Sequence, residues 1–281
     1  MEVLFPAGAP ARKPDDSSHW THDDQQERFM AFDFEGKVAV ITGGASGVGE
    51  ATVRALASAG AKVVVSDRDE GLGRELVESL GGDDVAVFVA TDTSDANGAG
   101  ALVKTALDRF GRLDIAFNNA EIRPAPTALV DQTAQDFGQV LTANLRSAFV
   151  SMRAEIPAML AAGGGSIINT SSVLGTLGAA NESAYVTSAH AVIGLTRGAA
   201  SDYASQGVRV NAILPGSVDP ATPRRAADAP EARDQAQETN PSRRPADPRE
   251  VADVVLWLAS EHSSYVTGAA IAVDGGTTAT L

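Results

Sequence analysis

Short, almost wholly apolar segments alternate with longer segments of helical periodicity from residue 36 to the end of the chain. Short apolar runs of this kind are typical of strands buried on both faces of a parallel sheet. The runs that we expect to form strands are 38–41, 63–65, 85–89, 113–117, 167–168, 208–214 and 270–273. The segments between them predict helices near 48–59, 69–80, 96–110, 132–162, 183–206 and 248–260.

This order of strands and helices predicts an α/β fold, a Rossmann-type doubly wound parallel sheet of about seven strands with helices on both faces. We assign residues 35–281 to a single domain of this kind. Two proline-containing segments, 121–131 and 217–248, each follow a predicted strand. Ligands of open α/β sheets bind at the carboxyl ends of the strands, so we expect both segments to border a binding site.

Residues 1–34 differ from the rest of the chain, because they show no apolar period and are rich in Pro, Asp, Gln and His. Such a segment buries too little apolar surface to offset the entropy lost on ordering, so we predict a flexible N-terminal extension. His19 and His22 lie in it, but a metal site needs more ligands than these two.

Composition excludes several classes of protein. The formal net charge of −14 argues against a nucleic-acid partner, which requires a basic surface. The chain has no cysteine, so it is not a disulfide-stapled scaffold, and no apolar run is long enough to span a membrane. Its first residues lack the basic and apolar regions of a signal peptide, so we expect a soluble cytoplasmic protein.

A glycine-rich turn joins the first predicted strand to the first predicted helix. It reads Thr-Gly-Gly-Ala-Ser-Gly-Val-Gly over residues 42–49. Glycines at a strand-to-helix turn let the backbone approach a pyrophosphate, whose charge is stabilised at the helix N-terminus. The second strand ends at Asp67, at a spacing suited to binding the ribose hydroxyls of a dinucleotide. This carboxylate would repel a 2′-phosphate and favours NAD over NADP, although Arg68 follows it directly.

Several motifs occur together in an order that resembles the single-domain branch of the short-chain dehydrogenase/reductase family. They are the TGxxxGxG turn, Asp92, Asn118-Asn119-Ala120, Asn144, Ser171-Ser172, Tyr185, Pro215-Gly216 and Val273-Asp274-Gly275-Gly276. The resemblance covers about residues 36–281 and implies an NAD(P)-dependent oxidoreductase that acts on a small alcohol or ketone. The cofactor-binding residues that we expect are Gly43, Ser46, Gly47, Val48, Gly49, Asp67, Arg68, Asp92, Asn118, Ala120, Tyr185, Pro215, Gly216 and Val218.

The resemblance also implies a catalytic set, and one member is missing. Tyr185 would exchange a proton with the substrate oxygen, Ser172 would bind that oxygen, and Asn144 would support a water relay. The family places a lysine four residues after the tyrosine, where it lowers the pKa of the phenol. Here that position is Ala189. His190 lies roughly 140° around the helix from Tyr185, so we do not expect it to substitute for the lysine.

Loss of the lysine leaves three functions open. The chain is an oxidoreductase of impaired activity, a non-redox enzyme such as a lyase, isomerase or cyclase, or a non-catalytic cofactor-binding relative. An alanine at this position fits a natural loss and an engineered replacement equally well. The glutamate at position 121 stands where the family has the glycine of its NNAG motif, and we weigh a solvated loop residue equally with a charge at the cleft mouth. The resemblance further implies a homo-oligomer, a tetramer or a dimer.

Overall fold

The computed structural model describes residues 32–219 and 240–280. Residues 1–31 of the predicted extension, with both of its histidines, lie outside the described residues. The same holds for residues 220–239, which make up most of the second proline-containing segment.

A parallel sheet of seven strands forms the centre of the described chain, as the apolar runs predict. Its strand order is β3-β2-β1-β4-β5-β6-β7. Each neighbouring pair is parallel, with β1 placed between β2 and β4. The strands are β1 (Val38–Thr42), β2 (Lys62–Asp67), β3 (Ala86–Ala90), β4 (Ile115–Asn118), β5 (Gly165–Thr170), β6 (Val208–Pro215) and β7 (Ala270–Val273).

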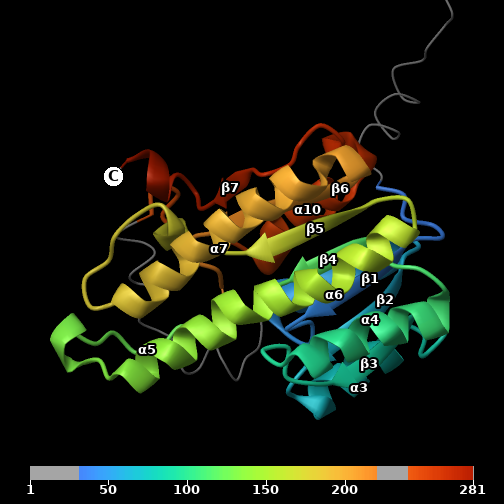
Figure 1. Ribbon diagram of the computed structural model, residues 1–281, viewed down its shortest axis with the longest axis horizontal. Coiled ribbons are helices and arrows are strands. Elements are labelled where there is room, and N and C mark those ends of the chain that lie inside the picture. The colour runs from blue at the N-terminus through green and yellow to red at the C-terminus, as the bar shows by residue number, and fades with distance from the viewer. Residues whose placement is uncertain (1–31, 220–239, 281) are drawn as a thin grey trace, which may run out of the picture. The chain divides into compact units, whose positions relative to one another are not determined.

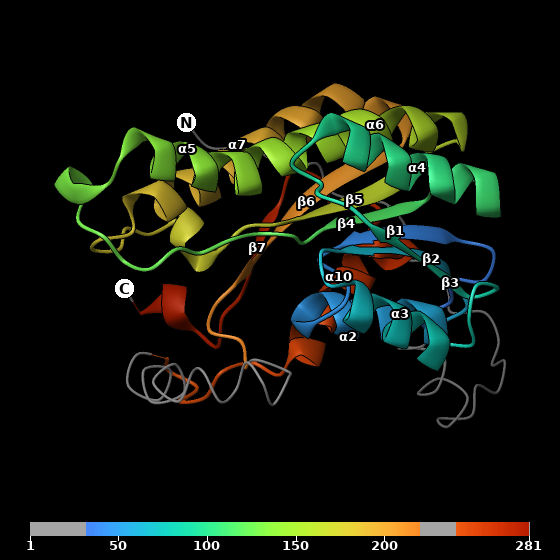
Figure 2. The same ribbon diagram turned by 90° about the horizontal axis from the view of Figure 1, so that it is seen from below.

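Helices cover both faces of this sheet (Figure 1). They are α2 (Gly47–Ser58), α3 (Glu70–Ser79), α4 (Ala96–Phe110), α5 (Ala134–Leu141), α6 (Ser147–Ala161), α7 (Ser183–Tyr203) and α10 (Pro248–Ala259). Seen from below, α4, α6 and α7 lie on one face, and α2, α3 and α10 lie on the other (Figure 2). Among the described residues, none of the helices combines the length and the apolar character that a membrane crossing requires.

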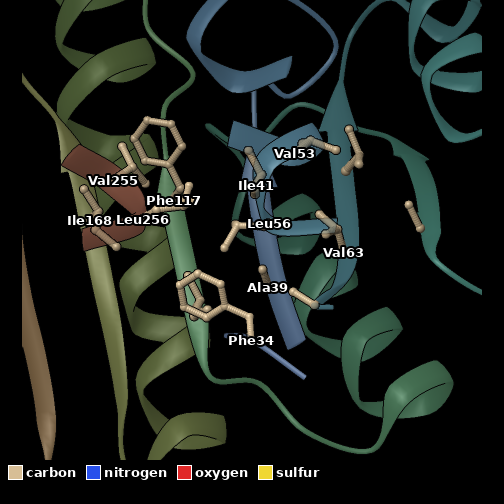
Figure 3. Packing of buried hydrophobic residues seen from close by; sticks show 14 of the residues in the cluster. Phe34, Ala39, Ile41, Val53, Leu56, Val63, Phe117, Ile168, Val255 and Leu256 are labelled. Atoms are coloured by element: carbon tan, nitrogen blue, oxygen red, sulfur yellow. The ribbon is translucent and has the colours of Figure 1, made fainter. Parts of the chain in front are cut away.

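Each face of the sheet has its own apolar core. On the side of α2 and α10, Leu56 and Val255 pack against strand residues such as Ile41 and Phe117 (Figure 3). Phe34 is only 2% exposed and belongs to the same core, with the Phe32 ring 6.2 Å from its own. The packed body therefore includes residues that the sequence analysis assigns to the flexible extension, because burying the Phe34 ring and packing the Phe32 ring against the core offset the cost of ordering them.

One predicted helix is interrupted. The segment expected to be a helix over 132–162 is α5 and α6 joined by a single wide π-helical turn at Thr142–Arg146. Turns of this type often occur at functional sites, because they direct one side chain away from the regular helical position. Here the turn carries Asn144, which is buried.

The strand order reverses direction between β1 and β4. The chain leaves β1 to build β2 and β3 on one side and returns to build β4 to β7 on the other. Such a point leaves a crevice at the carboxyl ends of the strands, where open α/β sheets bind their ligands. The glycine turn follows β1, and the segment with Asn119 and Glu121 follows β4, so both border this crevice.

Candidate active site

A cavity of about 710 Å³ lies at the carboxyl ends of the central strands. It brings together residues from most of the predicted motifs. Those of the expected site residues that line it are Gly43, Ser46, Gly47, Val48, Asp67, Arg68, Asp92, Ala120, Ser172, Tyr185, Pro215, Gly216 and Val218. Three others, Gly49, Asn118 and Asn144, are not among the described residues that line it.

The glycine turn disfavours larger side chains, at some positions because of the backbone conformation and at others because of crowding. Gly43 and Gly47 have φ angles of +61° and +56°, a conformation that residues with a Cβ rarely adopt. A Cβ on Gly49 would lie 2.0 Å from the carbonyl oxygen of Gly43, so only a glycine lets the backbone at this position pack against the turn. The start of α2 then faces the cavity with Ser46, Gly47 and Val48. A helix N-terminus of this form binds phosphate.

Asp67, at the end of β2, is held in place by backbone N–H groups. Its carboxylate accepts hydrogen bonds from the amides of Ala45, Arg68 and Asp69 at 3.1, 2.7 and 3.2 Å. Nη2 of Arg68 pairs with Oδ2 of Asp92 at 3.1 Å, and both side chains are exposed. The Arg68 guanidinium, which could attract a 2′-phosphate, is therefore already paired with the Asp92 carboxylate.

Asn118 points into the protein interior. Its Nδ2 donates to Oε2 of Glu155 at 3.1 Å and to Oδ1 of Asn169 at 3.0 Å. Glu155 is 1% exposed, and burial raises the pKa of its carboxyl group to about 7. The Asn118 side chain therefore joins β4, β5 and α6, and Asn118 is not among the described residues that line the cavity. Asn119 lines the cavity in its place.

The buried amide of Asn144 holds the segment after β4. Its Oδ1 accepts from the backbone N–H of Ile122 at 2.8 Å, and its Nδ2 donates to the Ile122 carbonyl at 2.9 Å. Nδ2 also donates to Oγ of Ser188 on α7 at 3.1 Å. Asn144 therefore connects the backbone directly after Glu121 to the π-helical turn and, through Ser188, to α7.

The hydroxyl of Tyr185 meets a carboxylate. Its Oη donates to Oε1 and Oε2 of Glu121 at 3.2 and 3.3 Å, and the tyrosine is 4% exposed. Burial, followed by the charge of Glu121, raises the pKa of Tyr185 far above its usual value, and this outweighs the opposing effects of the Ser172 hydroxyl and Arg123. Oγ of Ser172 accepts from the backbone N–H of Leu174 at 3.2 Å, so the serine side chain is oriented by its own turn.

Glu121 is an exposed residue that lines the cavity, and its carboxylate meets the Tyr185 hydroxyl there. Desolvation by the surrounding protein raises the pKa of its carboxyl group to about 7, while the hydrogen bond from Tyr185 and the charge of Arg123 act in the opposite direction. The Arg123 guanidinium lies 5.4 Å from the centre of the Tyr185 ring. It is paired with both carboxylate oxygens of Glu182 at 2.6 and 2.7 Å.

Ala189 is 4% exposed and lies one helical turn after Tyr185 on α7. Its carbonyl accepts a hydrogen bond from Oγ of Ser171 at 2.9 Å. His190 is exposed, and its Nδ1 lies 3.0 Å from the Val186 carbonyl on the same helix. Neither Ala189 nor His190 is among the described residues that line the cavity. For His190 this agrees with the expectation that its side chain points away from Tyr185 around the helix.

Sequence reasoning did not identify two contacts and one cavity residue that shape the site. Oγ1 of Thr42 accepts from the backbone N–H groups of Asn119 and Ala120 at 2.9 and 3.1 Å, which joins the ends of β1 and β4. Arg123 is a further cavity residue, and no motif marks it. The pairing of Glu121 with Tyr185 joins residues 64 positions apart, and its only signal in the sequence is an acid at the glycine of the NNAG motif.

Comparison with known proteins agrees with this geometry. A family model described as "Enoyl-(Acyl carrier protein) reductase" matches residues 43–278, from the glycine turn to the last described segment. The chain belongs to the short-chain dehydrogenase/reductase family. The description names the family model, and the residues matched include both the glycine turn and Tyr185.

Relatives in this family are dehydrogenases and reductases. The chain is 40% identical to the 2,5-dichloro-2,5-cyclohexadiene-1,4-diol dehydrogenase of Sphingobium indicum, over 88% of this chain and 99% of the relative. It is also 40% identical to the cyclohexanol dehydrogenase of an Acinetobacter species, over 90% and 99% of the two chains. A solved structure titled "Crystal structure of gox2181" superposes with a TM-score of 0.83 at 31% identity, covering 89% of this chain and 98% of that one.

These matches confirm the predicted fold and the oxidoreductase interpretation, and the family uses a nicotinamide nucleotide. The residues present fit such a group. A Cβ on Gly47 would meet open space, which leaves room for a pyrophosphate at the N-terminus of α2. Oγ of Ser66, which lines the cavity, is one of the buried polar atoms in the described residues without a hydrogen-bond partner. A ligand hydroxyl or amino group in the cavity would satisfy it.

Proposed function

We propose that this protein oxidises a secondary alcohol carried on a small ring, and reduces the corresponding ketone, with NAD(H) as its cofactor. The observation that carries the proposal is one cavity lined by the glycine turn, by Asp67, and by both Ser172 and Tyr185. A phenol and a hydroxyl group at one end and a phosphate-binding turn at the other suit a substrate oxygen beside a dinucleotide.

The chain's own residues have separate tasks in this reaction. Gly43, Gly47 and the start of α2 would hold the pyrophosphate, and Asp67 the adenosine ribose, while Pro215 and Val218 would border the nicotinamide. The bound cofactor supplies the hydride acceptor or donor. Ser172 would hold the substrate oxygen, and Tyr185 would exchange a proton with it.

A ring-shaped substrate is favoured by the relatives and by a second cavity. Curated relatives include the cyclohexanol dehydrogenase and a cis-4-hydroxycyclohexanecarboxylate dehydrogenase of Sinomonas cyclohexanicum, which is 39% identical. A cavity of about 270 Å³ adjoins the larger one, and both are lined by Ile122 and Tyr185. Its other apolar residues are Pro124, Ala125, Val140 and Ala184. Apolar walls beside a proton-exchanging group suit a saturated ring with one polar substituent.

The test is oxidation of a panel of cyclic alcohols, followed by the appearance of reduced nicotinamide. We expect turnover with cyclohexanol and ring-substituted cyclohexanols, and less with open-chain alcohols of equal carbon number. A panel without any NAD- or NADP-dependent turnover, in a protein that binds the cofactor, would favour a non-catalytic relative. Consumption of a ring substrate without a redox change would favour a non-redox enzyme on the same scaffold.

We further propose that NAD is preferred to NADP. The fixed carboxylate of Asp67 would repel a 2′-phosphate, and the pairing of Arg68 with Asp92 weakens the opposing attraction. We expect NADH to bind at least about tenfold more tightly than NADPH, a difference of about 1.4 kcal/mol. Titration of nicotinamide fluorescence measures both affinities.

A neutral variant isolates the carboxylate. Asp67→Asn keeps an acceptor oxygen for the backbone N–H groups, so we expect the preference to narrow mainly because NADPH binds more tightly. Asp69→Asn is the matched control, because Asp69 also lines the cavity and Asn still caps α3. Equal affinities in the unmodified protein, or equal effects of both variants, would contradict the role given to Asp67.

We also propose a cytoplasmic homo-oligomer, with Ala189 in the position of the family's lysine. The cysteine-free composition supports the location. The assembly is what the family resemblance implies, with the long helices α6 and α7 as the surfaces that would pair with a second copy.

A further inference from the structure

The partner of Tyr185 in this protein is an acid. Both oxygens of Glu121 lie within 3.3 Å of its hydroxyl oxygen. Among the described residues that line the cavity, the cations are Arg68 at the dinucleotide end and Arg123. Arg123 lies over the face of the Tyr185 ring and is paired with Glu182, so it does not replace a cation at the hydroxyl.

An acidic partner changes how the tyrosine exchanges protons. A nearby carboxylate and burial both disfavour the phenolate, so the phenol keeps its proton near neutral pH. A phenol that is already protonated takes a second proton only if it releases its own at the same time. Its own proton is directed at Glu121, and Tyr185 lines the cavity in which a substrate hydroxyl would bind.

We propose that Glu121 is the proton acceptor that works through Tyr185. During oxidation, the O–H bond of the substrate breaks and its proton forms a bond to Oη of Tyr185. The former proton of Tyr185 passes to a Glu121 oxygen at the same time. During reduction both transfers reverse, and the alkoxide oxygen receives the proton. The hydride leaves or enters the carbinol carbon by way of the nicotinamide, so electrons balance; this role rests on the proposed function.

The location of Glu121 suits an acceptor that must be used repeatedly. Its carboxylate faces the open cavity and can release a proton to water there. Its pKa of about 7 lets it take up and release a proton near neutral pH. A carboxyl group of ordinary pKa would hold the relayed proton too weakly.

The surrounding contacts hold this carboxylate at the phenol. The amide of Asn144 binds both backbone polar groups of Ile122, and the Arg123–Glu182 pair ties the same segment to the start of α7. Among the described residues, Arg123 is the charged group that acts on Glu121, and Glu182, directly before α7, pairs with Arg123. Asp136 of α5 lines the adjoining cavity, and Asp219, after β6, lines the main one.

The test uses the whole protein without cofactor or substrate. Tyrosine labelled with ¹³C at Cζ gives three signals, because the chain has three tyrosines, and Tyr203→Phe and Tyr265→Phe assign two of them. The Tyr185 signal reports the hydrogen bond to Glu121. We expect it to shift with pH, with a midpoint near pH 7 where Glu121 titrates.

Variants assign the midpoint. Glu121→Gln should abolish the pH-dependent shift of the Tyr185 signal. Glu121→Asp should keep a smaller shift, and this variant is used if the glutamine variant does not fold. Glu155→Gln is the control, because burial also raises the pKa of Glu155 to about 7, and this variant should leave the midpoint unchanged. A flat wild-type signal, or a midpoint that survives Glu121→Gln, would overturn the proposal.

Kinetics give a second readout. The relay needs an ionised Glu121 for oxidation and a protonated one for reduction. We therefore expect kcat/KM for alcohol oxidation to rise with pH through about 7 and that for ketone reduction to fall over the same range. Glu121→Gln should lower oxidation by about tenfold to a hundredfold at high pH and flatten the profile. A pH profile unchanged in Glu121→Gln would overturn the relay. Absence of all turnover would contradict the proposed function. The NMR measurement would still decide whether Glu121 is paired with Tyr185.

Discussion

Replacing Ala189 with lysine is expected to raise the rate of alcohol oxidation at least tenfold. The two positions, 185 and 189, lie one turn apart on the same face of α7, so an ammonium group at 189 can approach the phenol. A cation there favours the phenolate and opposes the effect of the Glu121 carboxylate. General acid–base assistance of this kind contributes about 10²- to 10⁴-fold, which sets the upper limit of the gain.

The measurement compares kcat for wild type, Ala189→Lys and Ala189→Met over the alcohol and ketone panel. Methionine is the matched control, because it has a long unbranched side chain without the charge. Ala189 is 4% exposed, so thermal unfolding of each variant separates loss of folding from loss of effect. An unchanged rate in a folded Ala189→Lys variant would contradict a latent redox site and favour the non-redox reading.

The Ala189→Lys variant also tests the role of Glu121 as the partner of Tyr185. With an ammonium group near the phenol, the tyrosine no longer depends on transferring its proton to Glu121. Glu121→Gln should therefore cost less in the Ala189→Lys background than in the wild type. Equal costs in both backgrounds would mean that the two positions act independently.

Tyr185→Phe is expected to lower turnover by about 10²- to 10⁴-fold in both directions. The substitution removes the only atom of the ring that can exchange a proton with the substrate oxygen, and it keeps the ring buried. It also removes the hydrogen bond that lowers the pKa of Glu121, so that pKa should rise further above 7. Cofactor affinity should change little, because the pyrophosphate and ribose groups meet other residues.

Turnover and NADH affinity are measured together for this variant. Tyr265→Phe is the control, since Tyr265 is fully exposed and the same oxygen is removed far from the cavity. A Tyr185→Phe enzyme that keeps wild-type turnover would show that the tyrosine is not the proton-exchanging group. A loss of NADH affinity as large as the loss of turnover would instead indicate that Tyr185 acts through the cofactor site.

The elements of the fold could be predicted because their signals are local. Buried parallel strands are apolar on both faces, so segments such as 208–214 are visible as continuous runs, and β6 at Val208–Pro215 confirms this one. The π-helical turn at Thr142–Arg146 could not be predicted, because it is stabilised by bonds from Asn144 to Ile122 and to Ser188 on another helix. The inclusion of Phe34 in the core likewise depends on the strands it packs against.

The sequence by itself determined the fold class, the family motifs and the alanine at position 189, since each depends on residue type and spacing along one segment. Tertiary structure alone decided which side chains meet. It turned Asn118 inward to Glu155 and placed Glu121 against the Tyr185 hydroxyl. Glu121 precedes Tyr185 by 64 positions, and its raised pKa comes from protein packed around it. This desolvation is a property of the folded chain, because an isolated loop would leave the same carboxylate in water with its ordinary pKa.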